Sequence, residues 1–211
     1  QFRVLVTYLR LLFLPVNKNL DYDYPISRSI DLPVIFSFLF LSVVLGMAVY
    51  LLSLSRQPGR SEWRLPAFGV FWFFITVSVE SSVIPIQDVI YEHRLYLPSV
   101  GVVLAFGAGL FYFLRYIKPQ VSPLQMTCFL LVAVIVPLGI ASYDRNGVWK
   151  DEQTLWEDVA KKSPYKGRGH MNLGGIYSAL GHVEEAALEY KTALRLSPNI
   201  PTVRYNVGVF Y

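Results

Sequence analysis

The sequence predicts an all-α protein in which a polytopic helical membrane domain, residues 1–142, is followed by a helical-repeat solenoid, residues 143–211. Hydrophobic residues make up 54% of the chain and charged residues 16%, whereas a soluble domain carries roughly 25% charged residues. Residues 1–142 hold 10 basic and 7 acidic side chains, while residues 143–211, half as many, hold 9 basic and 8 acidic side chains. Long apolar runs in the first part and a 34-residue period in the second complete the prediction.

This composition excludes a disordered chain and a disulfide framework, and it argues against an ordinary soluble enzyme. The lone Cys128 cannot form an intramolecular disulfide. The net charge of +4 comes mostly from basic residues between apolar runs, which indicates membrane orientation rather than nucleic-acid binding. Because the sequence begins at Gln1 without an initiator methionine and ends inside a repeat, we expect a longer chain with further spans upstream.

Four apolar runs are long enough to cross a bilayer, which takes roughly 20 residues. Residues 34–54 supply 21 residues without a charge, and residues 66–84 supply 19 with one ionisable side chain, Glu80. Residues 97–114 are uncharged and rich in glycine and alanine, which suits close helix packing in lipid. Residues 124–142 are also uncharged. We predict a membrane span at each run.

The start of the chain allows two interpretations. Residues 1–14 are apolar, but Arg3 and Arg10 lie seven positions apart on one helical face. Such a pattern fits an amphipathic helix in the membrane interface. It fits equally well the end of an earlier span.

The loops predict the orientation. Residues 55–65 contain three arginines and residues 115–123 two basic residues, whereas residues 15–33 and 85–96 together hold three basic and five acidic residues. The positive-inside rule places the arginine-rich loops in the cytoplasm. We therefore expect an integral membrane protein whose repeats lie outside the cytoplasm, in the bacterial periplasm or the lumen of the endoplasmic reticulum.

The last part of the chain repeats similar residues 34 positions apart: Pro164 and Pro198, Trp156 and Tyr190, Gly174 and Gly208, Tyr177 and Tyr211. This period is that of tetratricopeptide repeats. Residues 167–200 match one full repeat, with partial repeats on either side, and we interpret His170 and His182 as structural or solvated. About three repeats are needed for stability, so we expect either more repeats or a protein partner.

The stretch before the third run holds most of the candidate chemistry. Arg94 offers a planar, permanently charged fork for a phosphate. His93 can donate to the same phosphate or move a proton, and Glu92 can orient either side chain. The alternative is an interfacial belt, with Tyr91 and Tyr96 at headgroup depth and Arg94 bound to lipid or paired with Glu92.

Three further carboxylates are candidates. Asp21 and Asp23 flank Tyr22 in a loop, where they would bind a metal or orient a sugar hydroxyl, or belong to a solvated acidic loop. Glu80 lies inside an apolar run and would face a cavity or partner, or reach the interface. The sequence offers no cysteine–histidine metal spacing, no phosphate-binding glycine loop and no serine or cysteine nucleophile motif, and we predict no metal.

Four motifs occur in the order L-R-L-L-F-x-P, D-Y-x-Y, E-H-R-L-Y-L-P-S-V-G and R-N-x-V-W-x-D-E-x-T-L-W. Together they resemble the transmembrane and tetratricopeptide-repeat-containing proteins, which include O-mannosyltransferases, and their bacterial relatives. The resemblance implies a GT-C type glycosyltransferase that takes a sugar from a polyprenyl- or dolichyl-phosphate donor outside the cytoplasm. It also implies an acidic catalytic base in an earlier loop, upstream of Gln1.

Two functions follow from these observations. The first is a mannosyltransferase-like membrane enzyme whose repeats recruit a protein acceptor, with a lipid-phosphate-linked sugar as its donor. The second is a non-enzymatic membrane-anchored repeat scaffold, or an assembly subunit of a larger complex. The residues predicted to bind donor or substrate are Arg94, His93, Glu92, Tyr96, Asp21 and Asp23, with Glu80 as an intramembrane candidate.

Overall fold

The computed structural model describes residues 1–27, 29–80, 90–117 and 120–211, with Glu80 described by its backbone alone. Within these residues the chain forms nine α-helices and three short 3-10 helices and contains no strand, so the predicted all-helical class is confirmed. The chain divides into two compact units. Unit 1 comprises Gln1–Val16 and Ile26–Gly139, and unit 2 comprises Asn17–Pro25 and Ile140–Tyr211.

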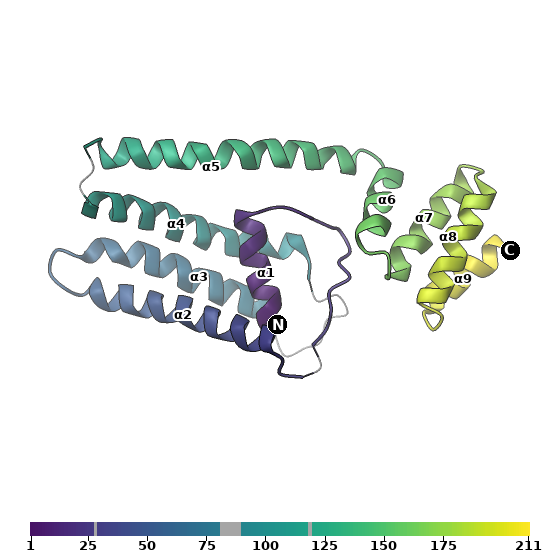
Figure 1. Cartoon of the computed structure of the whole chain (residues 1–211), viewed down its shortest axis with the longest axis horizontal. Coiled ribbons are helices and arrows are strands. Elements are labelled where there is room, and N and C mark those ends of the chain that lie inside the picture. The colour runs from purple at the N-terminus through teal and green to yellow at the C-terminus, as the bar shows by residue number, and fades with distance from the viewer. Residues whose placement is uncertain (28, 81–89, 118–119) are drawn as a thin grey trace. The chain divides into compact units, whose positions relative to one another are not determined.

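Unit 1 contains three long helices that pack in chain order, α2 on α3 and α3 on α4 (Figure 1). Their bounds are Leu32–Leu54, Arg64–Glu80 and Tyr96–Ile117, and α5 follows at Pro123–Asn146. Two 3-10 helices, η1 (Ser61–Trp63) and η2 (Glu92–Leu95), precede α3 and α4. Asp31 caps α2 because its carboxylate accepts a 3.0 Å hydrogen bond from the Val34 amide.

Three stretches of the described chain are long and apolar enough to cross a membrane: Leu32–Leu54, Glu92–Ile117 and Pro123–Trp149. They coincide with three of the four predicted spans. The fourth predicted span, residues 66–84, begins within α3, and its last four residues lie outside the described part, so it stays a prediction.

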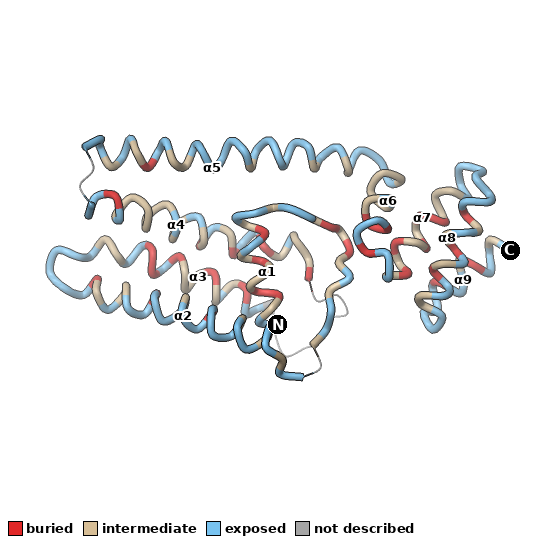
Figure 2. Tube along the Cα trace, viewed as in Figure 1, coloured by how far each residue is buried: buried red, intermediate tan, exposed pale blue. Residues whose placement is uncertain are grey.

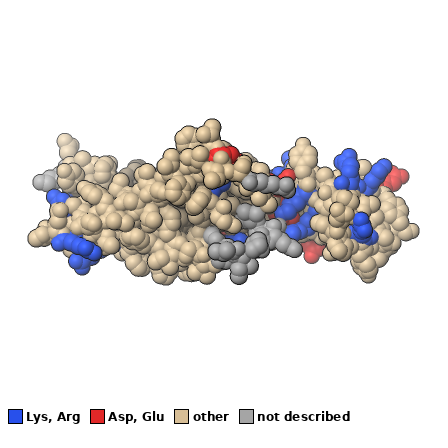
Figure 3. Space-filling model, turned by 90° about the horizontal axis from the view of Figure 1, so that it is seen from below, with Lys and Arg blue, Asp and Glu red and all other residues tan. Residues whose placement is uncertain are grey.

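The outer surfaces of these helices are apolar and exposed. Figure 2 shows α2 and α5 exposed along most of their length, and Thr127 is the buried residue of α5. On the face shown in Figure 3, most of the surface over the unit 1 helices is uncharged, and blue Lys and Arg side chains gather near the left end. An apolar surface of this extent is typical of helices that face lipid or neighbouring helices.

The contact between α3 and α4 depends on two glycines. A Cβ atom at either Gly69 or Gly101 would overlap the carbonyl oxygen of the other. A Cβ at Gly69 would also lie 2.7 Å from the Ala105 nitrogen. The close packing predicted for the small residues of this span is therefore present at Gly101 and Ala105. It does not extend to Gly107 and Gly109, where a Cβ would meet nothing within 4 Å.

Helix α1 (Phe2–Phe13) runs across the direction of α2, α3 and α4 in Figure 1. Its buried residues are Val4, Leu5, Tyr8 and Leu11, while Arg10 is exposed. Both interpretations of residues 1–14, an interfacial helix and the end of an earlier span, therefore stay open.

Unit 2 contains four short helices: α6 (Glu152–Lys162), α7 (Gly167–Ala179), α8 (Val183–Leu196) and α9 (Pro201–Phe210). Helix α7 packs against both α6 and α8, and α9 packs against both α7 and α8. Helices α7 and α8 fall inside residues 167–200, where the repeat pattern predicts a helical pair, and Gly181 turns between them with φ 78°. The identity of these helices as tetratricopeptide repeats stays a prediction.

The core of unit 2 forms around one tyrosine. Tyr190 of α8 packs with Met171 of α7 and with Val203 and Val207 of α9. Because a Cβ at Gly174 would lie 3.0 Å from the Tyr190 ring, glycine is the residue that lets α7 and α8 approach over this ring. Tyr190 therefore fills the space between α7, α8 and α9.

The R-N-x-V-W-x-D-E-x-T-L-W motif lies in unit 2 and stabilises the start of α6. The Asp151 carboxylate accepts a 2.8 Å hydrogen bond from the Thr154 amide, and this bond holds the pKa of Asp151 below its ordinary value. Arg145 donates a 2.5 Å bond to Asp158, which also pairs with Lys162 at 2.7 Å. Burial raises the pKa of Asp158, but the hydrogen bonds from Lys162 and Arg145 outweigh it and hold that pKa below its ordinary value.

Candidate functional site

The candidate site in unit 1 is a cluster of four residues in and before η2: Tyr91, Glu92, His93 and Arg94, hereafter the Tyr91 cluster. The guanidinium carbon of Arg94 lies 4.8 Å from the centroid of the Tyr91 ring. The centroid of the His93 ring lies 5.1 Å from that of the same tyrosine. Two of the predicted donor-binding side chains therefore meet at one aromatic ring.

The ends of the Tyr91 cluster are held by burial and by two hydrogen bonds. Ile90 and Leu95, which flank it, are 2% and 7% exposed. The backbone amide of Tyr91 donates a 3.0 Å hydrogen bond to the hydroxyl of Tyr8 in α1. On the other side, the indole of Trp72 in α3 donates a 2.9 Å bond to the Leu97 carbonyl in the first turn of α4.

Arg94 has the chemistry to recognise an anion. A guanidinium over an aromatic face is held by a cation–π contact, and the N–H groups of a guanidinium form a planar fork that matches the geometry of a phosphate. His93 is exposed beside it, and Glu92 is half-buried. Tyr96 is 80% exposed and lies beyond η2, in the first turn of α4. The residues before Ile90 in this stretch, Asp88 among them, lie outside the described part.

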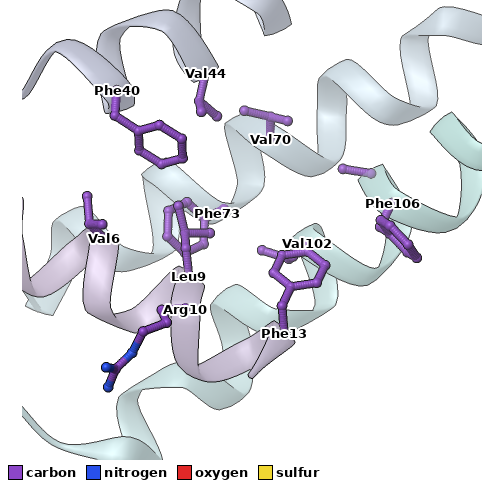
Figure 4. Close-up of a pocket in the computed structure, with 11 residues that line it drawn as sticks. Val6, Leu9, Arg10, Phe13, Phe40, Val44, Val70, Phe73, Val102 and Phe106 are labelled. Carbon is purple, nitrogen blue, oxygen red and sulfur yellow. The ribbon is translucent and has the colours of Figure 1, made fainter. Parts of the chain in front are cut away.

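An apolar groove of about 530 Å³ lies beneath α1 in unit 1 (Figure 4). Side chains from α1, α2, α3 and α4 line it, among them Leu9, Phe13, Phe40, Phe73, Val102 and Phe106. Arg10 lies at its edge, and Figure 4 shows the guanidinium directed away from the apolar side chains. This groove was not predicted, because its residues come from four separate helices and resemble ordinary membrane-facing residues.

The two loop aspartates lie in unit 2 and differ sharply in exposure. Asp21 is 3% exposed and pairs through one carboxylate oxygen with Lys166, and with Arg168 at 3.6 Å. Asp23 is exposed, and its backbone amide donates a 2.9 Å hydrogen bond to the Ser163 hydroxyl. The structure therefore gives Asp21 a packed, charge-neutralised position and leaves only the Asp23 carboxylate open to solvent.

Around Asp21 the segment Asn17–Pro25 is bonded to the turn between α6 and α7. The Asn19 side chain donates to the Ser163 hydroxyl at 2.8 Å, and Ser163 donates to the Asp21 carbonyl at 2.7 Å. Lys162 donates to the Lys18 carbonyl at 2.8 Å. The sequence did not indicate that this segment packs with the turn between α6 and α7, because the partners lie more than 140 positions apart.

The remaining candidates are the intramembrane Glu80, the charged loops and the histidines of unit 2. The Glu80 side chain, together with Arg28 and Lys118 of the charged loops, lies outside the described part. His170 of α7, predicted to be structural or solvated, contacts Glu189 at 2.6 Å and the Pro164 carbonyl at 3.1 Å, which fits the first of these alternatives. No group of three or more histidine, cysteine or acidic residues that could hold a metal ion occurs among the residues that the structure covers.

Comparison with known proteins finds several relatives of one kind. The chain is 35% identical over 162 residues to protein O-mannosyl-transferase Tmtc1 of Drosophila melanogaster, covering 76% of this chain and 18% of that protein. It is 33% identical over 118 residues to Tmtc2 of the same organism, covering 56% of this chain and 12% of that protein. To protein O-mannosyl-transferase F38B6.6 of Caenorhabditis elegans it is 27% identical over 190 residues, 90% of this chain and 26% of that protein.

The chain thus spans about an eighth to a quarter of the length of these relatives. No protein-family model matches it, and no solved structure does. The resemblance that the four sequence motifs predict is confirmed by the relatives.

Proposed function

Because the homologues of this chain are TMTC protein O-mannosyl-transferases, at 25–35% identity, we propose that it is part of a membrane enzyme that transfers mannose to protein. The donor is a polyprenyl-phosphate mannose of the dolichyl-phosphate type. The acceptor is a protein segment outside the cytoplasm, recruited by the helices of unit 2 acting as tetratricopeptide repeats.

One observation carries the proposal within this chain: Arg94 is stacked on Tyr91 next to α1, the helix that also lines the apolar groove. A polyprenyl-phosphate donor has a long apolar chain and an anionic head. The groove offers a surface for the chain, and the Arg94 fork offers charge-assisted hydrogen bonds to the phosphate.

In this mechanism the residues of the Tyr91 cluster and the groove bind and orient the donor. As mannose leaves, negative charge grows on the lipid phosphate, and a fixed guanidinium stabilises that charge electrostatically. His93, on the same ring, is placed to donate a second hydrogen bond to the phosphate. The base that accepts the proton from the acceptor hydroxyl is expected in an earlier loop, as the family resemblance implies.

The experiment is a transfer assay with the whole protein reconstituted in lipid, radiolabelled dolichyl-phosphate mannose and an acceptor protein. We expect label on serine or threonine of the acceptor, and none when free mannose replaces the lipid-linked donor. Absence of transfer together with stable co-purification of a protein partner would instead support the membrane-anchored scaffold.

A further inference from the structure

A hydrogen bond joins α1 to the backbone of the Tyr91 cluster: the Tyr91 amide donates to the hydroxyl of Tyr8 at 3.0 Å. Tyr8 is 3% exposed and belongs to the buried side of α1. A tyrosine buried this deeply usually has a partner for its hydroxyl. Here one such partner is the amide of Tyr91, the residue whose ring lies under Arg94.

Tyr91 holds Arg94 in two ways. Its ring lies under the guanidinium, with 4.8 Å from the ring centroid to Cζ. Its carbonyl accepts a 3.3 Å hydrogen bond from the Arg94 amide, which closes the first turn of η2. The ring and the carbonyl of Tyr91 therefore both help to hold Arg94 in place.

The Tyr91 amide lies at the start of η2, where an acceptor must come from outside that helix. Tyr91 has an extended backbone, φ −138° and ψ 130°, and precedes the first residue of η2. An amide in this position has no intrahelical acceptor. The Tyr8 hydroxyl supplies an acceptor from a separate helix.

We propose that Tyr8 is a positioning residue for donor binding: its hydroxyl fixes Tyr91, and Tyr91 fixes the guanidinium of Arg94 against the donor phosphate. This inference rests on the proposed function. It assigns to α1 a second role besides lining the groove, since the neighbouring residue Leu9 is one of the groove's side chains. The apolar chain and the phosphate of the donor would then be aligned by two adjacent residues of α1, Leu9 and Tyr8.

The test is Tyr8→Phe in the whole protein, which removes one hydroxyl and keeps the buried ring. Loss of one net hydrogen bond changes an equilibrium by about 3- to 10-fold. We expect the KM for dolichyl-phosphate mannose to rise by about that factor, with protein abundance and thermal stability close to those of the parent. The matched control is Tyr112→Phe in α4, whose ring lies 6.0 Å from that of Trp63, and it should leave the KM unchanged.

A double-mutant cycle separates positioning from a general structural role. If Tyr8 acts through Arg94, Tyr8→Phe adds little to the KM of an Arg94→Lys protein. Two outcomes would overturn the inference and leave the proposed function standing. One is an equal effect of Tyr8→Phe on the KM in both backgrounds. The other is an unchanged KM in Tyr8→Phe while Arg94→Lys raises the KM. Normal donor kinetics in Arg94→Lys itself would overturn the Arg94 assignment and this inference with it.

Discussion

The Ser163 hydroxyl donates a 2.7 Å hydrogen bond to the main-chain carbonyl of Asp21, a residue 142 positions earlier in the chain. Both residues are buried, at 1% and 3% exposed. Asn19, Lys162 and Lys166 add bonds between the same two segments. The middle of the loop between α1 and α2, Asn17–Pro25, is therefore an integral part of unit 2.

Asp21→Asn tests the role of this buried carboxylate. The substitution keeps the shape of the side chain but removes the charge that pairs with Lys166 and Arg168. A hydrogen bond to a charged group contributes about 1.5–3 kcal/mol, and the partial exposure of both cations places the expected loss near the lower end, about 1–2 kcal/mol. The measurement is unfolding by denaturant, in which protease cleavage within residues 17–25 reports the unfolded fraction.

Asp23→Asn is the matched control, because the Asp23 carboxylate is exposed and its backbone amide, which the substitution keeps, makes the bond to Ser163. We expect a change below about 0.5 kcal/mol, as for an ordinary surface substitution. A larger loss from Asp23→Asn than from Asp21→Asn would contradict the structural assignment of Asp21.

The Asp158 pairs predict that unit 2 loses stability in acid. The folded-state pKa of Asp158 lies below its ordinary value of 3.8, because hydrogen bonds from Lys162 and Arg145 outweigh its burial. A carboxyl with a lowered folded pKa contributes stability that is present above the unfolded pKa and is lost as pH falls through the folded pKa. Thermal unfolding between pH 7 and pH 3 should show this loss. In Asp158→Asn the pH dependence should be smaller, and an unchanged dependence would count against these pairs.

Gly69→Ala tests the α3–α4 contact. The added Cβ would overlap the Gly101 carbonyl, which is backbone and cannot move aside as a side chain can. Overpacking of this kind typically costs about 1–3 kcal/mol. We expect a lower thermal midpoint for the detergent-solubilised protein. Gly107→Ala, with nothing within 4 Å of the new Cβ, should not lower it, and equal effects at both glycines would refute the close contact.

Topology is tested by cysteine labelling in a Cys128→Ser background. The arginine-rich loop 55–65 is predicted to be cytoplasmic, so a cysteine at Ser61 should be protected from an impermeant thiol reagent in sealed membranes. A cysteine at the exposed Ser178 of α7 should be labelled from the extracytoplasmic side. The reverse pattern would contradict the orientation and the extracytoplasmic acceptor.

Local sequence patterns predicted the helices well, because each depends on neighbouring residues. Uncharged apolar runs located α2, α4 and α5, and the 34-residue period located α7 and α8. The motif around Arg94 was also visible, since its charged and aromatic residues adjoin an apolar run. These features need no knowledge of distant contacts.

The remaining features depend on contacts between distant segments. Tyr8 resembles any other buried residue of an amphipathic helix, and only the fold shows its hydroxyl at the Tyr91 amide. Asp21 and Asp23 have the same surroundings in sequence, so their difference in burial could not be predicted. The groove beneath α1 combines four helices and has no local signature.

The most direct test of donor binding by the Tyr91 cluster is mannose transfer by Arg94→Lys, measured in membranes alongside protein abundance. Lysine keeps the charge but loses the planar fork, so transfer should fall substantially at normal abundance. Mannose transfer by Arg94→Ala should fall further, by about 10- to 150-fold, because the variant loses a charge-assisted hydrogen bond of about 1.5–3 kcal/mol. Arg115→Lys in the last turn of α4 is the control and should transfer normally. Normal transfer by Arg94→Lys would contradict the central claim, since a residue that only anchors the helix at the membrane interface is replaced by lysine without loss.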